Sequence, residues 1–357
     1  MARFVLSVVV FLLLNSVSLP AWAVDPYAGN DPHWILIHEP AVLAELKLSR
    51  EQAGSLQKLT DELDLKFFPL RNRPAEEATR QIVDVTTRAR AEADSILLPA
   101  QKKRLNEILL QRLGSAALLQ PDVSGKLRYS AGQREKLEEI VNKTNLAVAE
   151  IQKNAESGDR LDRKIRDLQS DQQKKLLDVL KPAQRASLQN LFGAPFDHSK
   201  LGHPAFKAPE LVDSGEWINS PPLTLESLKG RVVVVHFYAF GCINCIHNYP
   251  WYREWADRFQ GKEVTIIGIH TPETSAERET ESVRRKATDE KFTFPILIDG
   301  KGGNWNAWGN SMWPSVYVID QRGYLRYFWP GELKWQGNDG EKLMRERIES
   351  LLANPPR

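Results

Sequence analysis

The chain has 357 residues, of which 42% are hydrophobic and 26% charged, and its formal net charge is +2. This length suggests two domains, because a single hydrophobic core usually stops growing at about 250 to 300 residues. The small net charge, with no long basic run, argues against nucleic acid as the partner.

The first 23 residues have the pattern of a cleaved secretory signal peptide. Arg3 supplies a positive charge, residues 4–14 form an apolar core, and Ala21 and Ala23 make a small-x-small cleavage site. The apolar stretch is short for a bilayer span of roughly 20 residues, so an uncleaved membrane anchor is the weaker alternative. We therefore expect an exported, periplasmic or otherwise extracytoplasmic chain, in a compartment where disulfides persist.

Residues 24–193 are predicted to form an all-α domain. Apolar residues recur there at spacings of three and four, and helix-favouring residues dominate. A short pattern occurs four times, with a Ser or Pro where a helix would begin and a Gln within its first turn. The four copies are LSREQ at 48–52, LLPAQ at 97–101, YSAGQ at 129–133 and LKPAQ at 180–184. The copies repeat after 81 and 83 residues, which indicates a duplicated unit.

These motifs resemble the LTxxQ-type helical repeats of the periplasmic Spy/CpxP-like proteins. The resemblance implies a helical module with a holdase or sensing role, and a packing or dimerisation module is the alternative. Pro195, Pro204 and Pro209, with Gly202 and without helical periodicity between them, predict a linker at 194–214.

Residues 215–357 are predicted to alternate strands and helices. Residues 230–240 and 263–271 are apolar, β-branched runs typical of strands buried on both faces, and 294–299 is a shorter strand. Residues 314–329 have the pattern of a β-hairpin about a Gln-Arg-Gly turn. A helix with Pro250 inside it follows the first strand, a polar-faced helix follows the second, and an amphipathic helix closes the chain.

Both cysteines of the chain, Cys242 and Cys245, lie where the first strand turns into its helix. A c-type haem requires CxxCH, but Ile246 separates the pair from His247. A structural zinc site requires four ligands, and no second ligand pair is evident. As a purely structural disulfide the pair would close a very small loop and so would stabilise little. Redox chemistry is the interpretation that the context favours.

The placement of the pair suggests a role for each thiol. At a helix N-terminus, free amides and the helix dipole stabilise a thiolate, so Cys242 is the predicted nucleophile. Cys245 follows one helical turn later, where it can resolve a mixed disulfide with the substrate.

The same region resembles the thioredoxin superfamily, and within it the TlpA-like branch with its DipZ-like and NHL-protein-type subgroup. The stretches that carry the resemblance are 217–219, 228–245, 264–273, 305–320 and 323–332. It implies a thioredoxin-like α/β fold and exchange of dithiol and disulfide with protein partners, with no dissociable cofactor and no metal. It also implies that Pro314 is a cis-proline facing the CxxC motif and that Trp313 offers backbone groups to the substrate.

Two positions depart from the family pattern. His236 stands where a proton-transferring carboxylate is common, and it is either a general base for Cys245 or a core histidine. Gly241 replaces the usual Trp before the nucleophile, which should leave Cys242 more open to substrate. His247 and Glu273 are further candidates, respectively for stabilising the thiolate and for relaying a proton.

The sequence therefore predicts an exported thiol-disulfide oxidoreductase with a helical repeat domain, supplied by a membrane or periplasmic electron donor. The competing hypothesis makes the helical half a client-binding or dimerising module, with a redox-sensing or non-catalytic thioredoxin-like domain. Thiol peroxidase activity is disfavoured because the P-x-x-x-T-x-x-C arrangement of peroxiredoxins is absent before Cys242.

Overall fold

The computed structural model describes residues 31–154, 159–202, 204–213 and 216–356. The predicted signal peptide lies outside these residues. The described chain forms two compact units, one made of residues 40–47 and 97–202 and the other of residues 31–39, 48–96 and 204–356. Among the described helices, none combines the length and the apolarity that crossing a bilayer requires.

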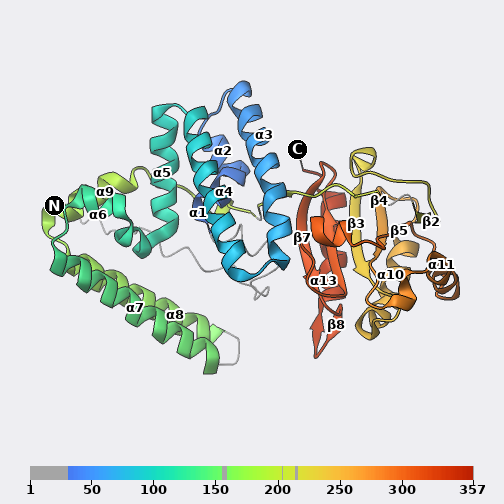
Figure 1. The fold of residues 1–357 in the computed structure, drawn as a ribbon. Helices are drawn as coiled ribbons and strands as arrows, with labels where there is room; N and C mark the ends of the chain where they lie inside the picture. The colour runs from blue at the N-terminus through green and yellow to red at the C-terminus, as the bar shows by residue number, and fades with distance from the viewer. Residues whose placement is uncertain (1–30, 155–158, 203, 214–215, 357) are drawn as a thin grey trace. The chain divides into compact units, whose positions relative to one another are not determined.

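The first unit is helical, as predicted. Its longest elements, α7 and α8, lie side by side as an antiparallel hairpin (Figure 1). Its core contains Leu110, Leu137, Leu176 and Leu188, all buried. Its helices are α2 (Pro40–Glu45), α5 (Pro99–Leu113), α6 (Pro121–Leu127), α7 (Ala131–Asn154), α8 (Asp159–Val179) and α9 (Pro182–Phe192).

The glutamines of the repeated motif explain its recurrence. The Oε1 atom of Gln133 accepts a hydrogen bond from the Ser130 amide, and that of Gln184 from the Lys181 amide, at 3.2 and 2.9 Å. Each Nε2 atom then donates to a carbonyl just before the other motif, Gln133 to Val179 and Gln184 to Leu127. Each glutamine thus caps its own helix and fixes a second segment of chain.

The other two copies repeat this bonding. Gln52 accepts from the Ser49 amide at 3.0 Å and donates to the Ile96 carbonyl at 2.9 Å. Gln101 accepts from the Leu98 amide and donates to the Leu46 carbonyl, at 2.8 and 3.2 Å. The sequence separations match those of the later pair to within two residues.

The second unit is built on a seven-stranded sheet of order β1-β7-β6-β3-β4-β5-β2. Strands β3, β4 and β5 are parallel, and the remaining pairs are antiparallel. The predicted strands and hairpin all form, within a few residues of the expected bounds. The strands are β1 (Phe206–Lys207), β2 (Trp217–Ile218), β3 (Val232–Tyr238), β4 (Val264–His270), β5 (Ile296–Ile298), β6 (Ser315–Ile319) and β7 (Tyr324–Pro330), with β8 (Lys334–Trp335) and β9 (Asn338–Asp339) in a separate hairpin.

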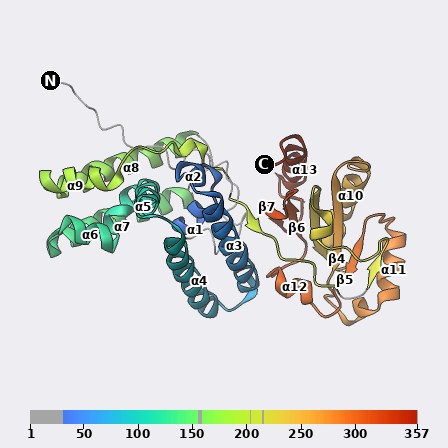
Figure 2. The same cartoon turned by 90° about the horizontal axis from the view of Figure 1, so that it is seen from above.

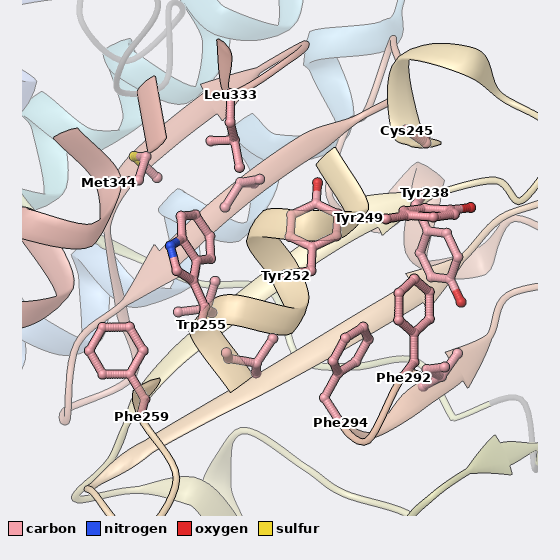
Figure 3. Close-up of a cluster of buried hydrophobic side chains, with 14 of the residues drawn as sticks. Tyr238, Cys245, Tyr249, Tyr252, Trp255, Phe259, Phe292, Phe294, Leu333 and Met344 are labelled. Carbon is pink, nitrogen blue, oxygen red and sulfur yellow. The ribbon is translucent and has the colours of Figure 1, made fainter. Parts of the chain in front are cut away.

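One face of the sheet is covered by α10 (Ile243–Arg258) and α13 (Gly340–Ala353), with α11 (Thr280–Asp289) beside them (Figure 2). Figure 3 shows the aromatic cluster on this face, in which Tyr252, Trp255 and Phe294 are buried. Helix α10 continues through Pro250. This face of the fold carries the cysteine-bearing helix.

The opposite face is covered partly by helices from the first hundred residues. These are α1 (Pro32–His38), α3 (Arg50–Phe67), η2 (Phe68–Asn72) and α4 (Ala75–Ile96), together with the short α12 (Gly303–Ala307). Phe68 packs edge-on against Trp308, with ring centroids 6.4 Å apart. Gly309, at φ +56°, must be glycine because an added Cβ would lie 1.7 Å from the Phe68 carbonyl oxygen.

The compact units therefore divide the chain differently from the predicted domains at 24–193 and 215–357. Polar contacts explain the difference. The Tyr324 hydroxyl on β7 donates to Asp61 at 2.8 Å, and the Lys207 amide on β1 donates to buried Asp64 at 2.7 Å. Because α3 makes these long-range bonds along one face, residues 48–96 pack with the sheet. Helical periodicity alone could not indicate that packing.

Arg71 is expected to be a main stabiliser of this packing. Its Nη1 atom lies 3.1 Å from the Tyr317 hydroxyl and 3.4 Å from the Trp308 carbonyl oxygen, and its guanidinium carbon lies 4.4 Å from the Phe328 ring centroid. Loss of these bonds and of the cation–π contact in Arg71→Ala should lower the free energy of unfolding by about 2 to 3 kcal/mol. Urea unfolding measures it, with Arg73→Ala at an exposed neighbour as control. Equal stability of the two variants would contradict the assignment.

Candidate active site

The site begins where β3 ends. The run Val232–Tyr238 is buried along its whole length, so the chain leaves the middle of the sheet at a fixed point. Residues 239–241 turn the chain, and α10 starts at Ile243 with Cys242 as its N-cap residue. The amides of Cys245 and Ile246 donate to the Cys242 carbonyl, each at 3.1 Å, which closes the first helical turn under the nucleophile. The predicted placement of both cysteines is therefore observed.

The Cys242 thiol is set up to ionise near neutral pH. A hydrogen bond from the Cys245 thiol is the largest influence, and with the amides of Cys245 and Asn244 it lowers the pKa of Cys242 to about 7, against the opposing effect of burial. The residue is 9% exposed, whereas Cys245 is 0% exposed. A substantial fraction of this thiol is thus a nucleophilic thiolate at pH 7.

Cys245 has the opposite properties. It is 0% exposed, and burial together with the hydrogen bond to Cys242 raises the pKa of its thiol well above the usual range. The negative charge of Glu273 raises the pKa of both cysteines. One thiol with a lowered pKa at the N-cap of α10 and one fully buried, protonated thiol form an asymmetric pair.

Pro314 lies at the same end of the sheet. The Trp313–Pro314 peptide bond is cis, as the family resemblance implies. Strand β6 pairs with β3 so that Ser315 is opposite Phe237, which brings Pro314 to the point where β3 turns towards Cys242. The cis-proline therefore shares the carboxyl-end edge of β3 with the cysteine pair.

Apolar side chains lie on the segments that flank the pair. Trp313 packs against Trp305 of α12, with ring centroids 4.1 Å apart and ring planes tilted by 30°. Met312 and Ile243 are 46% and 61% exposed. Trp305 was not predicted from the sequence. Its nearest indication is its place in the stretch 305–320 of the family resemblance.

His236 is enclosed in the aromatic cluster. Its ring stacks on Tyr252 at 3.9 Å and 23° and meets Phe294 edge-on at 5.1 Å. Among the described residues neither ring nitrogen has a hydrogen-bond partner, and burial lowers the pKa of His236 to about 3. An imidazole with that pKa is neutral at pH 7 and a weak base. The geometry favours a core histidine over a general base. The His236 ring nevertheless lacks the hydrogen bond to the backbone that is expected of a core histidine.

Replacing His236 with phenylalanine should make the protein less sensitive to acid. The unfolded chain binds a proton at this histidine below about pH 6.5 and the folded chain does not until about pH 3. The contribution of His236 to the free energy of unfolding is therefore constant above pH 6.5. Between about pH 6.5 and pH 3 it falls by about 1.4 kcal/mol for each pH unit. In His236→Phe, the free energy of unfolding measured by urea titration should lack this contribution to its pH dependence between pH 6 and pH 4.

Above pH 7 the stability difference between the two proteins should not change with pH, which is an internal control. Resolution of a trapped mixed disulfide should proceed at the wild-type rate in His236→Phe. A slower rate would instead restore the proton-transfer role of this residue.

The other candidates are placed as follows. His247 is half exposed on α10, and its Nδ1 atom lies 3.0 Å from an oxygen of Glu332. Glu273 is exposed in the loop after β4 and acts on both cysteines through its charge. Gly241 precedes Cys242, and its amide donates to buried Glu277 at 2.9 Å. In the described part of the chain, no group of three or more His, Cys, Asp or Glu side chains is arranged to hold a metal ion.

Besides Trp305, two more residues of this site escaped prediction. Glu277 lies on η6 (Ser275–Arg278), and the Nε2 atom of His270 accepts a long, 3.4 Å hydrogen bond from the Phe240 amide. Both contact the turn between β3 and α10. His270 begins the H-T-P-E stretch, in which the sequence singles out Glu273 as a candidate proton relay. Neither residue has a sequence spacing to the cysteines that indicates contact.

Residues 203–328 match the AhpC/TSA family. The chain is 32% identical over 169 residues to DipZ of Mycobacterium tuberculosis, a match that covers 46% of this chain but only 24% of DipZ. It is 27% identical over 146 residues to the thiol-disulfide oxidoreductase YkuV of Bacillus subtilis, covering 41% of this chain and 93% of YkuV. A crystallised thioredoxin-like superfamily protein is 28% identical to this chain, with a TM-score of 0.38. The match covers 42% of this chain and 99% of the crystallised chain.

Proposed function

We propose that this chain, whose C-terminal half belongs to the thioredoxin superfamily and is DipZ-like, is an exported thiol-disulfide oxidoreductase that acts on protein substrates. The observation that carries the proposal is the asymmetry of the two cysteines. Cys242 is the helix N-cap, 9% exposed, with its pKa lowered to about 7, whereas Cys245 is 0% exposed and its pKa is raised. This is the division of labour that two-step disulfide exchange requires.

The proposed reaction runs in two steps. The Cys242 thiolate attacks one sulfur of a substrate disulfide, forming a mixed disulfide and releasing the other substrate sulfur as a thiolate that takes up a proton. Cys245 then loses its proton and attacks the Cys242 sulfur. The substrate leaves as a dithiol and the Cys242–Cys245 disulfide forms, so two electrons pass from enzyme to substrate. A dithiol donor in the membrane or periplasm must restore the reduced pair.

The flanking segments support a substrate with apolar residues beside its cysteine. Ile243 and Met312 are exposed, and the Trp305–Trp313 pair is half-buried. A chain extended past Pro314 could use the backbone groups of Trp313, which is the role proposed for that residue. Met adapts to varied partners, which suits a site that accepts several substrate sequences.

Turnover of a model protein disulfide tests the proposal. Reduced protein should accelerate insulin reduction by dithiothreitol and should consume hydrogen peroxide no faster than a Cys242→Ser control. The peroxide measurement matters because the matched family is AhpC/TSA. Peroxide consumption without insulin turnover would replace the proposal with a peroxidase function. Turnover of neither substrate would remove the enzyme interpretation.

A binding function of the helical unit is the second candidate. The specific observation is Leu146 on α7, which is 72% exposed on a long hairpin. A holdase would suppress aggregation of a denatured client equally well with Cys242→Ser, and Leu146→Lys should impair it. A dimerising hairpin would instead show a change of mass with Leu146→Lys in analytical ultracentrifugation.

A further inference from the structure

The Glu277 carboxylate occupies an unusual position for a fully buried charge. The residue is 1% exposed and lies on η6, away from the cysteines in sequence. Its Oε1 atom accepts from the Gly241 amide at 2.9 Å, immediately before the nucleophile. Its Oε2 atom accepts from the amides of Glu273 and Thr274 at 2.6 and 3.4 Å. One side chain thus joins the turn before Cys242 to the loop that carries Glu273.

This contact also explains the glycine before the nucleophile. A Cβ atom built on Gly241 would lie 2.3 Å from Oε1 of Glu277, closer than real Cβ contacts come. Any side chain at position 241 would have to push the carboxylate off the amide that it binds. Gly241 and Glu277 therefore form a pair in which the glycine makes room for the carboxylate.

The chemistry of the site requires a carboxylate in particular. Both oxygens of Glu277 accept from N–H groups, and no described side-chain donor competes for them. A glutamine in its place would have one oxygen and one NH₂ group. The NH₂ group would then face a backbone N–H group, and two donors cannot form a hydrogen bond with each other. A buried charge that accepts several backbone hydrogen bonds is satisfied, whereas a misdirected amide is not.

We propose that Glu277 is a positioning residue of the active site, which fixes the Gly241 turn before Cys242 and holds the Glu273 loop against the cysteine pair. The inference rests on the proposed function. It assigns to Glu277 no contact with substrate. Its effect reaches the reaction through the direction of the Cys242 side chain and through the charge of Glu273.

The test is a double-mutant cycle between positions 241 and 277. Gly241→Ala alone should slow insulin turnover by about ten- to a hundredfold, because the turn before the nucleophile shifts. Glu277→Ala should cause a similar loss. The double variant should be no slower than Glu277→Ala, because the added methyl group then has room. If the loss of insulin turnover in the double variant equalled the product of the losses in the two single variants, the pairing of Gly241 with Glu277 would be overturned.

The pH profile of Cys242 alkylation gives a readout that does not depend on turnover. In Glu277→Ala a buried negative charge is lost and the Glu273 loop is released, so the midpoint should fall below its wild-type value by about half a pH unit or more. Glu277→Gln should resemble Glu277→Ala, and Glu279→Gln, at an exposed position two residues on, should resemble wild type.

An unchanged midpoint in Glu277→Ala, with the variant folded by thermal unfolding, would overturn the proposal. If Glu277→Ala does not fold, Gly241→Ala still reports, because it displaces the carboxylate without removing it. If wild type lacks insulin turnover, the proposed function fails, while the alkylation cycle continues to test the coupling of Gly241 and Glu277.

Discussion

Cys242→Ser should lose at least about a thousandfold of insulin turnover, since serine at this position offers no comparable nucleophile. Cys245→Ser should also abolish turnover, but for a different reason. Its Cys242 would still attack the substrate, and no second thiol would release the product. A covalent complex with substrate should therefore accumulate in Cys245→Ser and should be absent from Cys242→Ser. Non-reducing electrophoresis and intact mass spectrometry distinguish these two results.

The burial of Cys245 explains why only Cys245→Ser should trap the substrate. Cys245 is 0% exposed, so a substrate should not reach it directly, and Cys242→Ser should form no complex even at high substrate concentration. Equal trapping by both single variants would contradict the assignment of nucleophile and resolving thiol. Removing the Cys245 hydrogen bond should also raise the pKa of Cys242 in Cys245→Ala, because that bond is the largest influence lowering it and alanine, unlike serine, has no hydroxyl to donate in its place.

Much of the site could be predicted because short sequence stretches indicate where the strands begin and end. The apolar run of β3 followed by CxxC places the pair at the end of a central strand, and the 314–329 pattern places Pro314 on its neighbour. Pairing of β3 with β6 then follows from the fold that the resemblance implies. Such arguments depend on short stretches whose periodicity is visible in the sequence.

The residues that escaped prediction act across long sequence distances. Glu277 reaches Gly241 from 36 residues away, and Tyr324 binds Asp61 from 263 residues away. Glutamate and aspartate on polar helices are ordinarily solvated, so nothing in the local pattern distinguishes these two. For His236 the sequence leaves a general base and a core histidine open, and the surrounding rings, which leave its imidazole neutral, favour the core histidine. Whether a polar residue is buried depends on tertiary packing, which a single sequence does not reveal.

The Cys242–Cys245 pair should have a reduction potential close to that of thioredoxin, about −270 mV, and far from that of DsbA, about −120 mV. A strongly stabilised thiolate favours the reduced form and makes a pair oxidising, as in DsbA, whose cysteine has a pKa of about 3.5 against about 7 in thioredoxin. The pKa of Cys242 is lowered only to about 7, and Glu273 opposes ionisation. The chain should therefore act as a reductant. Equilibration with a dithiothreitol redox buffer measures the potential.

Glu273→Gln tests the electrostatic part of this prediction. Removing the charge that raises the pKa of both cysteines should favour the Cys242 thiolate and move the potential in the oxidising direction. The shift should be about 10 to 30 mV, because about 30 mV corresponds to a tenfold change in the equilibrium and solvent screens this exposed carboxylate. Glu279→Gln, an equal change of charge at another exposed position, should leave the potential unaltered. A wild-type value near −120 mV would identify an oxidant, and a shift in the reducing direction would show that Glu273 does not act through its charge.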